Sequence, residues 1–184
     1  MTGITISRAL TLSAVFLAGT TAVTATPAQA AEVKITSLGS HAGEFCRQDR
    51  ALIFEDPDGT RLLYDPGRTV AGGNDPRLGK IDAVLVSHMH GDHAGDRHLP
   101  APGAGTCAKP DVSAKATPHT NAANIAIATG AKIVTGSEMP KFFAGKLKAL
   151  GGDPKKSVLV RFGASTTVGG VTITTVPAAH SNGV

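Results

Sequence analysis

The chain has 184 residues, a length typical of one domain. Its hydrophobic content of 41% and charged content of 17% predict a folded core and exclude a disordered tail. Only 4% of the residues are aromatic, none is Trp, and the net charge of +4 is scattered, with no basic run longer than Lys155-Lys156. Without a basic stripe or stacking aromatics, we expect no nucleic-acid partner.

The first 30 residues have the pattern of a secretory signal peptide. Arg8 precedes an apolar stretch from Ala9 to Ala18, which is too short to span a bilayer as a helix. Ala28-Gln29-Ala30 matches the small-residue cleavage site. We expect cleavage after Ala30 and an exported mature chain, residues 31–184, that is periplasmic or secreted and has no membrane segment. An uncleaved N-terminal anchor is the alternative.

Export bears on Cys46 and Cys107, the only cysteines of the chain. An oxidising compartment would allow them to form a disulfide. Two cysteines in loops could instead stay free or bind a metal, and the sequence does not fix the distance between them. A Cys46–Cys107 disulfide is therefore one of three alternatives.

The first elements of the mature chain are short predicted strands. An alternating segment at 33–38 and two apolar runs at 51–55 and 61–65 predict strands, and Asp58-Gly59 predicts a hairpin turn between the two runs. The next run, 81–87, is apolar except for one aspartate, which is typical of a strand buried on both faces.

Strands and helices are mixed in the second half. A Pro/Gly/Ala-rich stretch, 99–121, predicts a long loop, and such loops often shape a site. The elements expected after it are a helix at 121–129, a strand at 132–135, a helix at 137–150 stopped by Gly151-Gly152, and strands at 157–162, 166–168 and 171–176. This order favours an α/β (α+β) fold with helices packed on a layered sheet.

One motif carries chemistry: Ser87-His88-Met89-His90-Gly91-Asp92-His93, directly after the most apolar strand. In an extended segment, His88 and His90 point the same way and can grip one metal ion. Gly91 allows a sharp turn that delivers Asp92 and His93 to a neighbouring position. Imidazoles with a carboxylate suit zinc, and less often iron or manganese. A solvated His-rich loop is the alternative, and the position after a buried strand argues against it.

The motif resembles the signature of the metallo-β-lactamase-fold hydrolases. Tyr64-Asp65-Pro66-Gly67 and the later Thr174-Thr175-Val176-Pro177-Ala178-Ala179-His180-Ser181 also resemble that family. The resemblance implies an αββα sandwich with metal ions at one edge of its two sheets. The Pro-Ala-Ala-His-Ser segment is more similar to the lactonase-like branch than to true β-lactamases, in which the third His usually follows a Gly.

The resemblance also implies roles for individual residues. His88, His90 and His180 would hold a first metal, whereas Asp92 and His93 would belong to a second. Asp92 would in addition help to orient a hydroxide shared by two zinc ions, and is the predicted catalytic residue. His41, His98 and His119 are expected to be ordinary loop histidines.

The family's later bridging Asp and last His have no counterpart after His180. We therefore expect the N-terminal half of the sandwich and the start of its second half, in a domain at 31–184 that is incomplete at its C-terminus. Such a half would expose an apolar sheet face.

The expected activity is that of an exported zinc-dependent hydrolase acting on an ester, lactone, amide or phosphoester of small-molecule size. A β-lactamase of the same fold and a non-catalytic metal-binding fragment are the alternatives. The sequence leaves open the substrate, the oligomeric state and whether one or two zinc ions bind.

Overall fold

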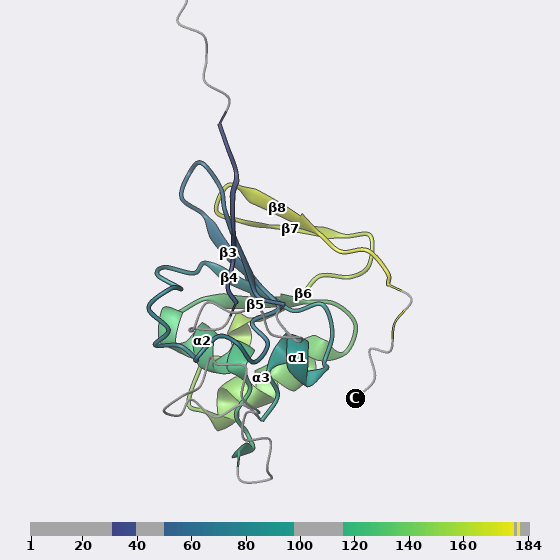
Figure 1. Cartoon of the computed structure of the whole chain (residues 1–184). Coiled ribbons are helices and arrows are strands. Elements are labelled where there is room, and N and C mark those ends of the chain that lie inside the picture. The colour runs from purple at the N-terminus through teal and green to yellow at the C-terminus, as the bar shows by residue number, and fades with distance from the viewer. Residues whose placement is uncertain (1–30, 40–49, 98–115, 179, 181–184) are drawn as a thin grey trace, which may run out of the picture. The chain divides into compact units, whose positions relative to one another are not determined.

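The structure is a computed structural model, and it describes residues 31–39, 50–97, 116–178 and 180 (Figure 1). The chain divides into two units, 1–30 and 31–184, and only the second is described here. The predicted signal peptide, Cys46 and Cys107 lie outside the described residues. Within those residues, no helix is long and apolar enough to cross a membrane.

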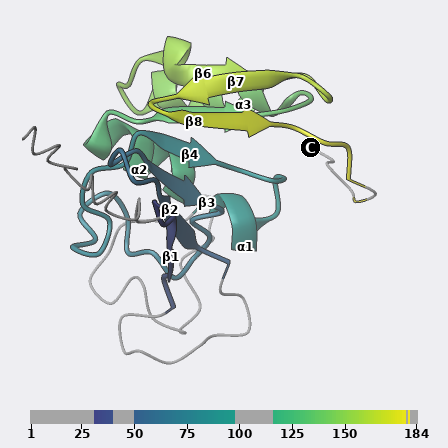
Figure 2. The ribbon, with the colours of Figure 1, turned by 90° about the horizontal axis from the view of Figure 1, so that it is seen from above.

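A six-stranded sheet forms the centre of the unit, with its strands in the order β1-β2-β3-β4-β5-β6. Figure 2 shows the first four following one another across the sheet. The strands are β1 (Lys34–Ser37), β2 (Leu52–Glu55), β3 (Arg61–Tyr64), β4 (Ala83–Leu85), β5 (Lys132–Thr135) and β6 (Ser157–Leu159). The first three pair antiparallel and β3 to β6 pair parallel, so the carboxyl ends of β3, β4 and β5 meet at one edge.

Helices cover one face of this sheet. They are α2 (Asn121–Thr129) and α3 (Met139–Ala149), while α1 (Gly91–Ala94) is a single turn and η2 (Pro154–Lys156) is a short 3-10 helix. The apolar face of α3 presents Phe143 and Leu147, and both are buried with Ile125 of α2 against Val84 and Ile133 of the sheet. This layer is the main hydrophobic core, whose burial is the dominant favourable term in folding.

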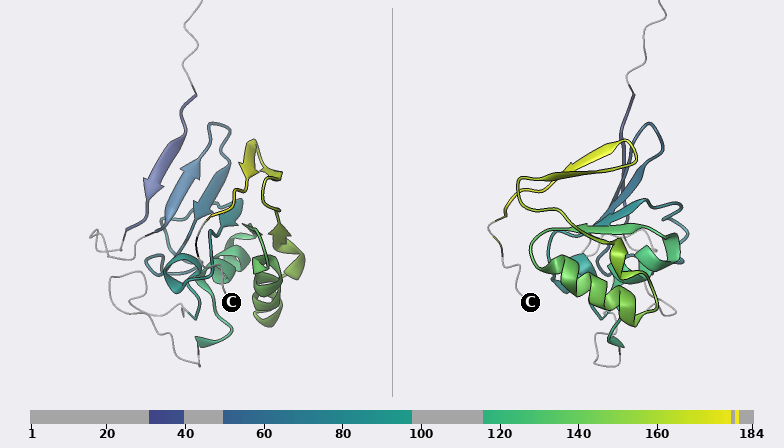
Figure 3. Two further views of the ribbon diagram at one scale, coloured as in Figure 1. Left: turned by 90° about the vertical axis from the view of Figure 1, so that its right-hand side faces the viewer. Right: turned by 180° about the vertical axis from the view of Figure 1, so that it is seen from behind.

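A hairpin covers part of the opposite face, as Figures 1 and 3 show. It consists of β7 (Ser165–Val168) and β8 (Val171–Thr174), which form a two-stranded sheet of their own. Val168 of the hairpin is buried together with Leu62, Ala83 and Val134 of the large sheet. Helix layer, sheet and hairpin together confirm the predicted α/β (α+β) fold, in which helices pack on a layered sheet.

The expected elements agree closely with the observed ones. Helix α2 and strand β5 have the predicted bounds, and β6 and β8 end a few residues earlier than predicted. The turn α1 was not predicted, and most of the expected loop at 99–121 lies outside the described residues. At the two edges of the sheet, Ile35 of β1 is 60% exposed and Leu159 of β6 is 44% exposed.

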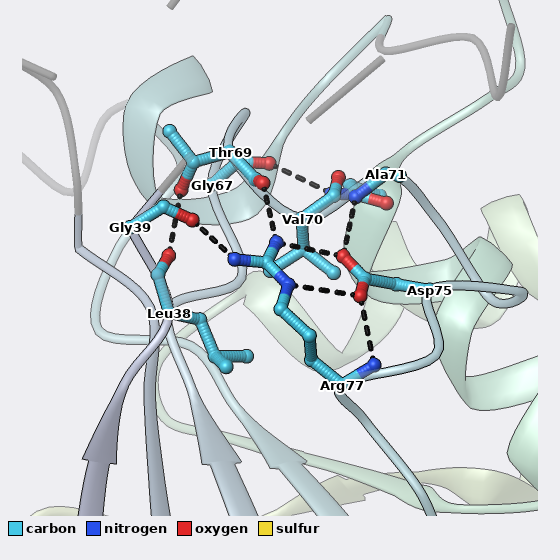
Figure 4. A network of polar contacts seen from close by, with 9 residues as sticks. Leu38, Gly39, Gly67, Thr69, Val70, Ala71, Asp75 and Arg77 are labelled. Carbon is cyan, nitrogen blue, oxygen red and sulfur yellow. Dashed lines mark hydrogen bonds and ion pairs between the residues drawn. The ribbon is translucent and has the colours of Figure 1, made fainter. Parts of the chain in front are cut away.

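A polar network anchors the connection from β3 to β4 to the end of β1 (Figure 4). The Asp75 carboxylate is fully buried and pairs with the Arg77 guanidinium at 2.8 Å. The same guanidinium donates to the carbonyl of Thr69 at 3.0 Å and to that of Gly39. The Ala71 amide donates to Asp75 at 3.0 Å. One ion pair thus fixes two chain segments that lie about forty positions apart.

Candidate metal centre

Three histidines meet at the edge of the sheet where β4 ends. The possible ligand atoms of His88, His90 and His180 all lie within 4.8 Å of one another. Nε2 of His180 is 3.2 Å from Nε2 of His88. The ring centroids of His88 and His90 are 4.6 Å apart, and those of His90 and His180 are 5.2 Å apart. The His88 ring is buried, whereas His90 and His180 are exposed, so the group faces solvent on one side.

This geometry fits a divalent metal ion. Two imidazole nitrogens that bind one tetrahedral zinc ion, each at about 2.0 Å, lie about 3.3 Å apart. The separation of 3.2 Å between the Nε2 atoms of His88 and His180 agrees with that value. A third imidazole on the open side, with solvent beyond it, is the ligand set of metal sites that keep one position for water or substrate.

The three histidines come from two different layers of the fold. His88 and His90 follow β4, the central buried strand. His180 follows β8, which crosses the other face of the sheet, and Thr175 fixes the path after that strand. Its hydroxyl donates to the Arg161 carbonyl at 2.6 Å, and its amide donates to the Ala164 carbonyl at 3.1 Å. In Figure 2, the chain that leaves β8 extends toward the end of the sheet at which α1 lies.

Asp92 and His93 lie beside the three histidines, on α1. The His93 ring centroid is 3.9 Å from that of His88. Nε2 of His93 is 3.5 Å from Oδ2 of Asp92, and the same carboxylate oxygen is 3.6 Å from the Arg50 guanidinium. The two side chains predicted for a second metal are thus brought together as a pair, one nitrogen and one oxygen, next to the group of three.

The structure places a further residue, Asp65, beside the candidate metal centre. The sequence pattern assigned no role to this residue. Its carboxylate is almost fully buried and accepts the Ser87 amide at 2.8 Å and the Ser87 hydroxyl at 2.7 Å. Nδ1 of His93 lies 2.7 Å from the same carboxylate. The signal in the sequence is an acidic residue directly after a strand, because the carboxyl ends of neighbouring parallel strands share an edge.

Close backbone approach holds α1 against the turn that carries Asp65. The Gly67 amide donates to the His93 carbonyl at 2.9 Å. A Cβ at Gly67 would lie 2.4 Å from the Asp92 carbonyl oxygen, and Gly67 has a φ of +52°. Asn121 of α2, fully buried, donates to the Gly67 carbonyl at 3.0 Å from the other side. The position of Asp92 and His93 is therefore set by contacts that only glycine permits.

Comparison with known proteins shows the family of this chain. A family model described as a beta-lactamase superfamily domain matches residues 48–184, which include every residue of the candidate centre. This chain belongs to the beta-lactamase superfamily. The resemblance to metallo-β-lactamase-fold proteins is thereby confirmed, while membership of the lactonase-like branch stays a prediction.

Curated relatives in this superfamily carry a functional name. The chain is 29% identical over 150 residues to a UPF0173 metal-dependent hydrolase of Pyrococcus furiosus. The aligned region covers 82% of this chain and 49% of the relative. It is 30% identical over 141 residues to a UPF0173 metal-dependent hydrolase of Anaeromyxobacter dehalogenans. That aligned region covers 72% of this chain and 40% of the relative. The chain thus spans about half the length of the curated relatives it matches.

The electrostatics of this beta-lactamase superfamily site favour neutral His88. Burial of the ring lowers the pKa of His88, and the neighbouring charges of His93, His90 and His180 lower it further. A neutral imidazole is the form that binds a metal.

Tyr64, the residue before Asp65, is also affected by its surroundings. Burial raises the pKa of the Tyr64 hydroxyl, and the negative charge of Asp65 raises it further.

An apolar cavity of about 280 Å³ adjoins the centre, between the sheet and the hairpin. Ser87 and Ala178, which flank the metal-site segments in sequence, line one part of it. Thr135 also lines the cavity. Its hydroxyl is buried and has no hydrogen-bond partner among the described residues.

Among the described residues, His119 is not part of the group formed by His88, His90 and His180. Its Nδ1 is 3.0 Å from the side-chain oxygen of Asn124, next to the start of α2. His41 and His98 lie outside the described residues.

Proposed function

We propose that this chain is the metal-binding part of a hydrolase that acts on small molecules and uses zinc. The observation that carries the proposal is the convergence of His88, His90 and His180 within 4.8 Å. The printed name of the relatives, metal-dependent hydrolase, supports the reaction class. Three imidazoles favour zinc over harder ions, since carboxylate and water ligands suit magnesium or calcium better.

The chain's own residues have separate roles in this proposal. His88, His90 and His180 would hold the first metal, and Asp92 with His93 would hold a second. A divalent metal, when bound, supplies a Lewis acid that polarises a carbonyl or phosphoryl group and activates water for attack. Asp92 is the predicted catalytic residue, because its carboxylate borders the centre and can accept a hydrogen bond from the attacking water.

The substrate class follows from what surrounds the centre. We propose an ester, lactone, amide or phosphoester with an apolar part, because the adjoining cavity is lined by Leu85, Val134, Phe162 and Val176 among others. A β-lactam is the alternative substrate within the same fold. No feature of the described surface suggests a nucleic-acid partner, since the aromatic content is low and the basic residues are scattered.

The test measures metal content and hydrolysis together. The purified protein is assayed for zinc, iron and manganese, and for turnover of chromogenic ester, lactone and phosphoester substrates and of nitrocefin. We expect bound zinc and hydrolysis of a non-β-lactam substrate, both lost in the double variant His88→Ala, His90→Ala. His119→Ala is the matched control. Zinc and hydrolysis that persist in the double variant would refute the assignment, and zinc without any turnover would favour a non-catalytic metal-binding role.

Export is a separate part of the proposal. The compact unit begins at Ala31, the residue that would follow cleavage after Ala30, and this coincidence supports a removable signal peptide. We expect the mature N-terminus to be Ala31 in the periplasm or medium of an expressing cell. An intact Met1 on membrane-associated protein would instead favour an uncleaved anchor.

A further inference from the structure

We infer that hairpin β7–β8 is held on the sheet by two polar anchors, the contact of its turn with Thr60 and the metal centre itself. Thr60 is then a positioning residue for His180, although it lies before β3 and touches none of the three histidines. The inference rests on the proposed function, because His180 is one of the proposed metal ligands. It implies that metal binding and docking of the hairpin strengthen each other.

The hairpin shares little buried surface with the rest of the fold. It is a two-stranded sheet of its own, outside the hydrogen-bonded order of β1 to β6. Within β7 and β8, Val168 is the one buried residue, and the others are half-buried or exposed. Segments with few buried apolar contacts open locally at a lower free energy than the core does. The hairpin can therefore open while the large sheet stays folded.

The first anchor lies at the turn of the hairpin. The Gly170 amide donates to the Thr60 hydroxyl oxygen at 3.1 Å, across 110 positions of the chain. Thr60 is buried, and the Asp58 carboxylate accepts the Thr60 amide at 2.7 Å, which fixes the position of the acceptor. A Cβ at Gly169 would lie 2.0 Å from the Thr60 hydroxyl oxygen, so the turn packs directly on this residue.

The second anchor lies at the other end of the hairpin. His180 follows β8, and its Nε2 is 3.2 Å from Nε2 of His88. Between the anchors, the Thr175 hydroxyl donates to the Arg161 carbonyl at 2.6 Å, which closes the base of the hairpin onto its own connection from β6. Figure 1 shows the turn of the hairpin beside β3 and the opposite end leading to the C-terminal segment.

Two anchors on one element are coupled thermodynamically. A docked hairpin presents His180 to an ion, whereas an open hairpin leaves the ion with His88 and His90. The apparent metal affinity is therefore reduced in proportion to the fraction of protein whose hairpin is docked. An ion that binds the docked form more tightly also favours docking, and the two effects are equal by linkage. Thr60 thus acts on the metal through the hairpin.

Three substitutions change the first anchor to different degrees. Thr60→Val removes the acceptor of the Gly170 amide and keeps the branched shape, whereas Thr60→Ser keeps the hydroxyl. Gly169→Ala acts more strongly, because the new Cβ overlaps Thr60 and the φ of +55° disfavours a side chain. Gly151→Ala is the matched control, since Gly151 has a φ of +80° at the end of α3 but nothing within 4 Å of the added Cβ.

The first readout is amide hydrogen exchange in chelator-treated protein. We expect the amides of β7 and β8 to exchange faster than those of β3, β4 and β5. Thr60→Val should speed exchange in the hairpin by a further factor of about 2–10, from the loss of one hydrogen bond, and leave the sheet amides unchanged. Thr60→Ser should exchange as the unsubstituted protein does. A merely structural role of Thr60 would instead speed hairpin and sheet together.

The second readout adds zinc. Saturating zinc should slow exchange in β7 and β8 by about tenfold or more, because opening would release a ligand. In His180→Ala, bound zinc should no longer slow exchange in the hairpin. Gly169→Ala should lower zinc affinity by about tenfold or more, measured by competition with a chromogenic chelator, while Gly151→Ala binds within twofold of the unsubstituted protein.

Each result decides. Zinc that binds without slowing the hairpin, unchanged hairpin exchange in Thr60→Val, or a folded Gly169→Ala protein with unchanged zinc affinity overturns the inference and leaves the metal site in place. If Gly169→Ala does not fold, the Thr60 and His180 variants decide alone. No zinc binding at all would refute the metal site and the inference together. Zinc binding with a protected hairpin but no turnover would refute the proposed hydrolase alone.

Discussion

Nε2 of His180 lies 3.2 Å from Nε2 of His88, although the two residues are 92 positions apart in the chain. One follows the hairpin on one face of the sheet, and the other follows the strand at its centre. The segment after β4 supplies two imidazoles of the three-histidine group, and the segment after β8 supplies the third. The meeting of the two layers is what creates the candidate centre.

Replacement of His180 should therefore weaken metal binding more than loss of an outer contact does. We expect His180→Ala to lower zinc affinity by more than the about 10–100-fold typical of an outer hydrogen-bond partner, because an imidazole ligand is removed. Zinc titration against a competing chelator measures the effect. His119→Ala, a histidine bonded to Asn124 and not to the centre, should bind as the unsubstituted protein does. Equal affinities of the two variants would contradict the role of His180.

Gly67 should tolerate no side chain. A Cβ there would lie 2.4 Å from the Asp92 carbonyl oxygen, on a residue with a φ of +52°. We expect Gly67→Ala to lower the free energy of unfolding by about 2–4 kcal/mol, from backbone strain and overlap together.

The control for this variant is Gly59→Ala. Gly59 also has a positive φ, +85°, but nothing lies within 4 Å of its added Cβ. Only the backbone term, about 1–2 kcal/mol, should be lost. Urea denaturation of both proteins compares them, and equal losses would show that the approach to Asp92 is unimportant.

The ion pair beneath the β3–β4 connection should be a stabilising contact (Figure 4). Arg77→Ala removes the guanidinium that pairs with the fully buried Asp75 carboxylate, and we expect a loss of about 2–3 kcal/mol in the free energy of unfolding. Lys80→Ala is the control, because Lys80 is 70% exposed and its pair with Asp82 should contribute less than about 1 kcal/mol. Denaturant unfolding that gives both variants the same midpoint would argue against this view of the network.

The stability of the metal-free protein should depend on pH through His88. Burial first, and then the charges of the neighbouring histidines, lower the pKa of His88 in the folded state. At pH values between this lowered pKa and the ordinary histidine pKa of about 6.5, the unfolded chain binds more protons than the folded chain does. The free energy of unfolding should therefore fall as the pH is lowered from about 6.5 toward the folded pKa.

Chelator-treated protein, unfolded by urea at a series of pH values, tests this dependence. In His88→Gln the side chain no longer titrates, so the loss of stability on acidification should be smaller than in the unsubstituted protein. An identical pH dependence in both proteins would mean that His88 does not carry it.

Local sequence signals were sufficient for most elements of this fold. The bounds of α2 follow from the apolar run between Asn121 and Gly130, and α3 ends where Gly151 adopts a φ of +80°. The hairpin turn at Asp58-Gly59 and the buried strand before His88 were equally legible, because turn chemistry and hydrophobic periodicity are fixed within a few residues. The four-residue turn α1 was missed, since it has no periodic pattern long enough to detect.

The sequence by itself determined that a metal-binding motif follows a buried strand, and that the chain resembles metallo-β-lactamase-fold proteins. Only the tertiary structure decided that Asp65 and Ser87 stand behind the rings of His88 and His93, and that Gly67 lets α1 approach. The physical reason is distance along the chain. A motif is written in neighbouring residues, whereas a contact between β3 and α1 exists only after the sheet has aligned its strand ends and packing has closed the gap between them.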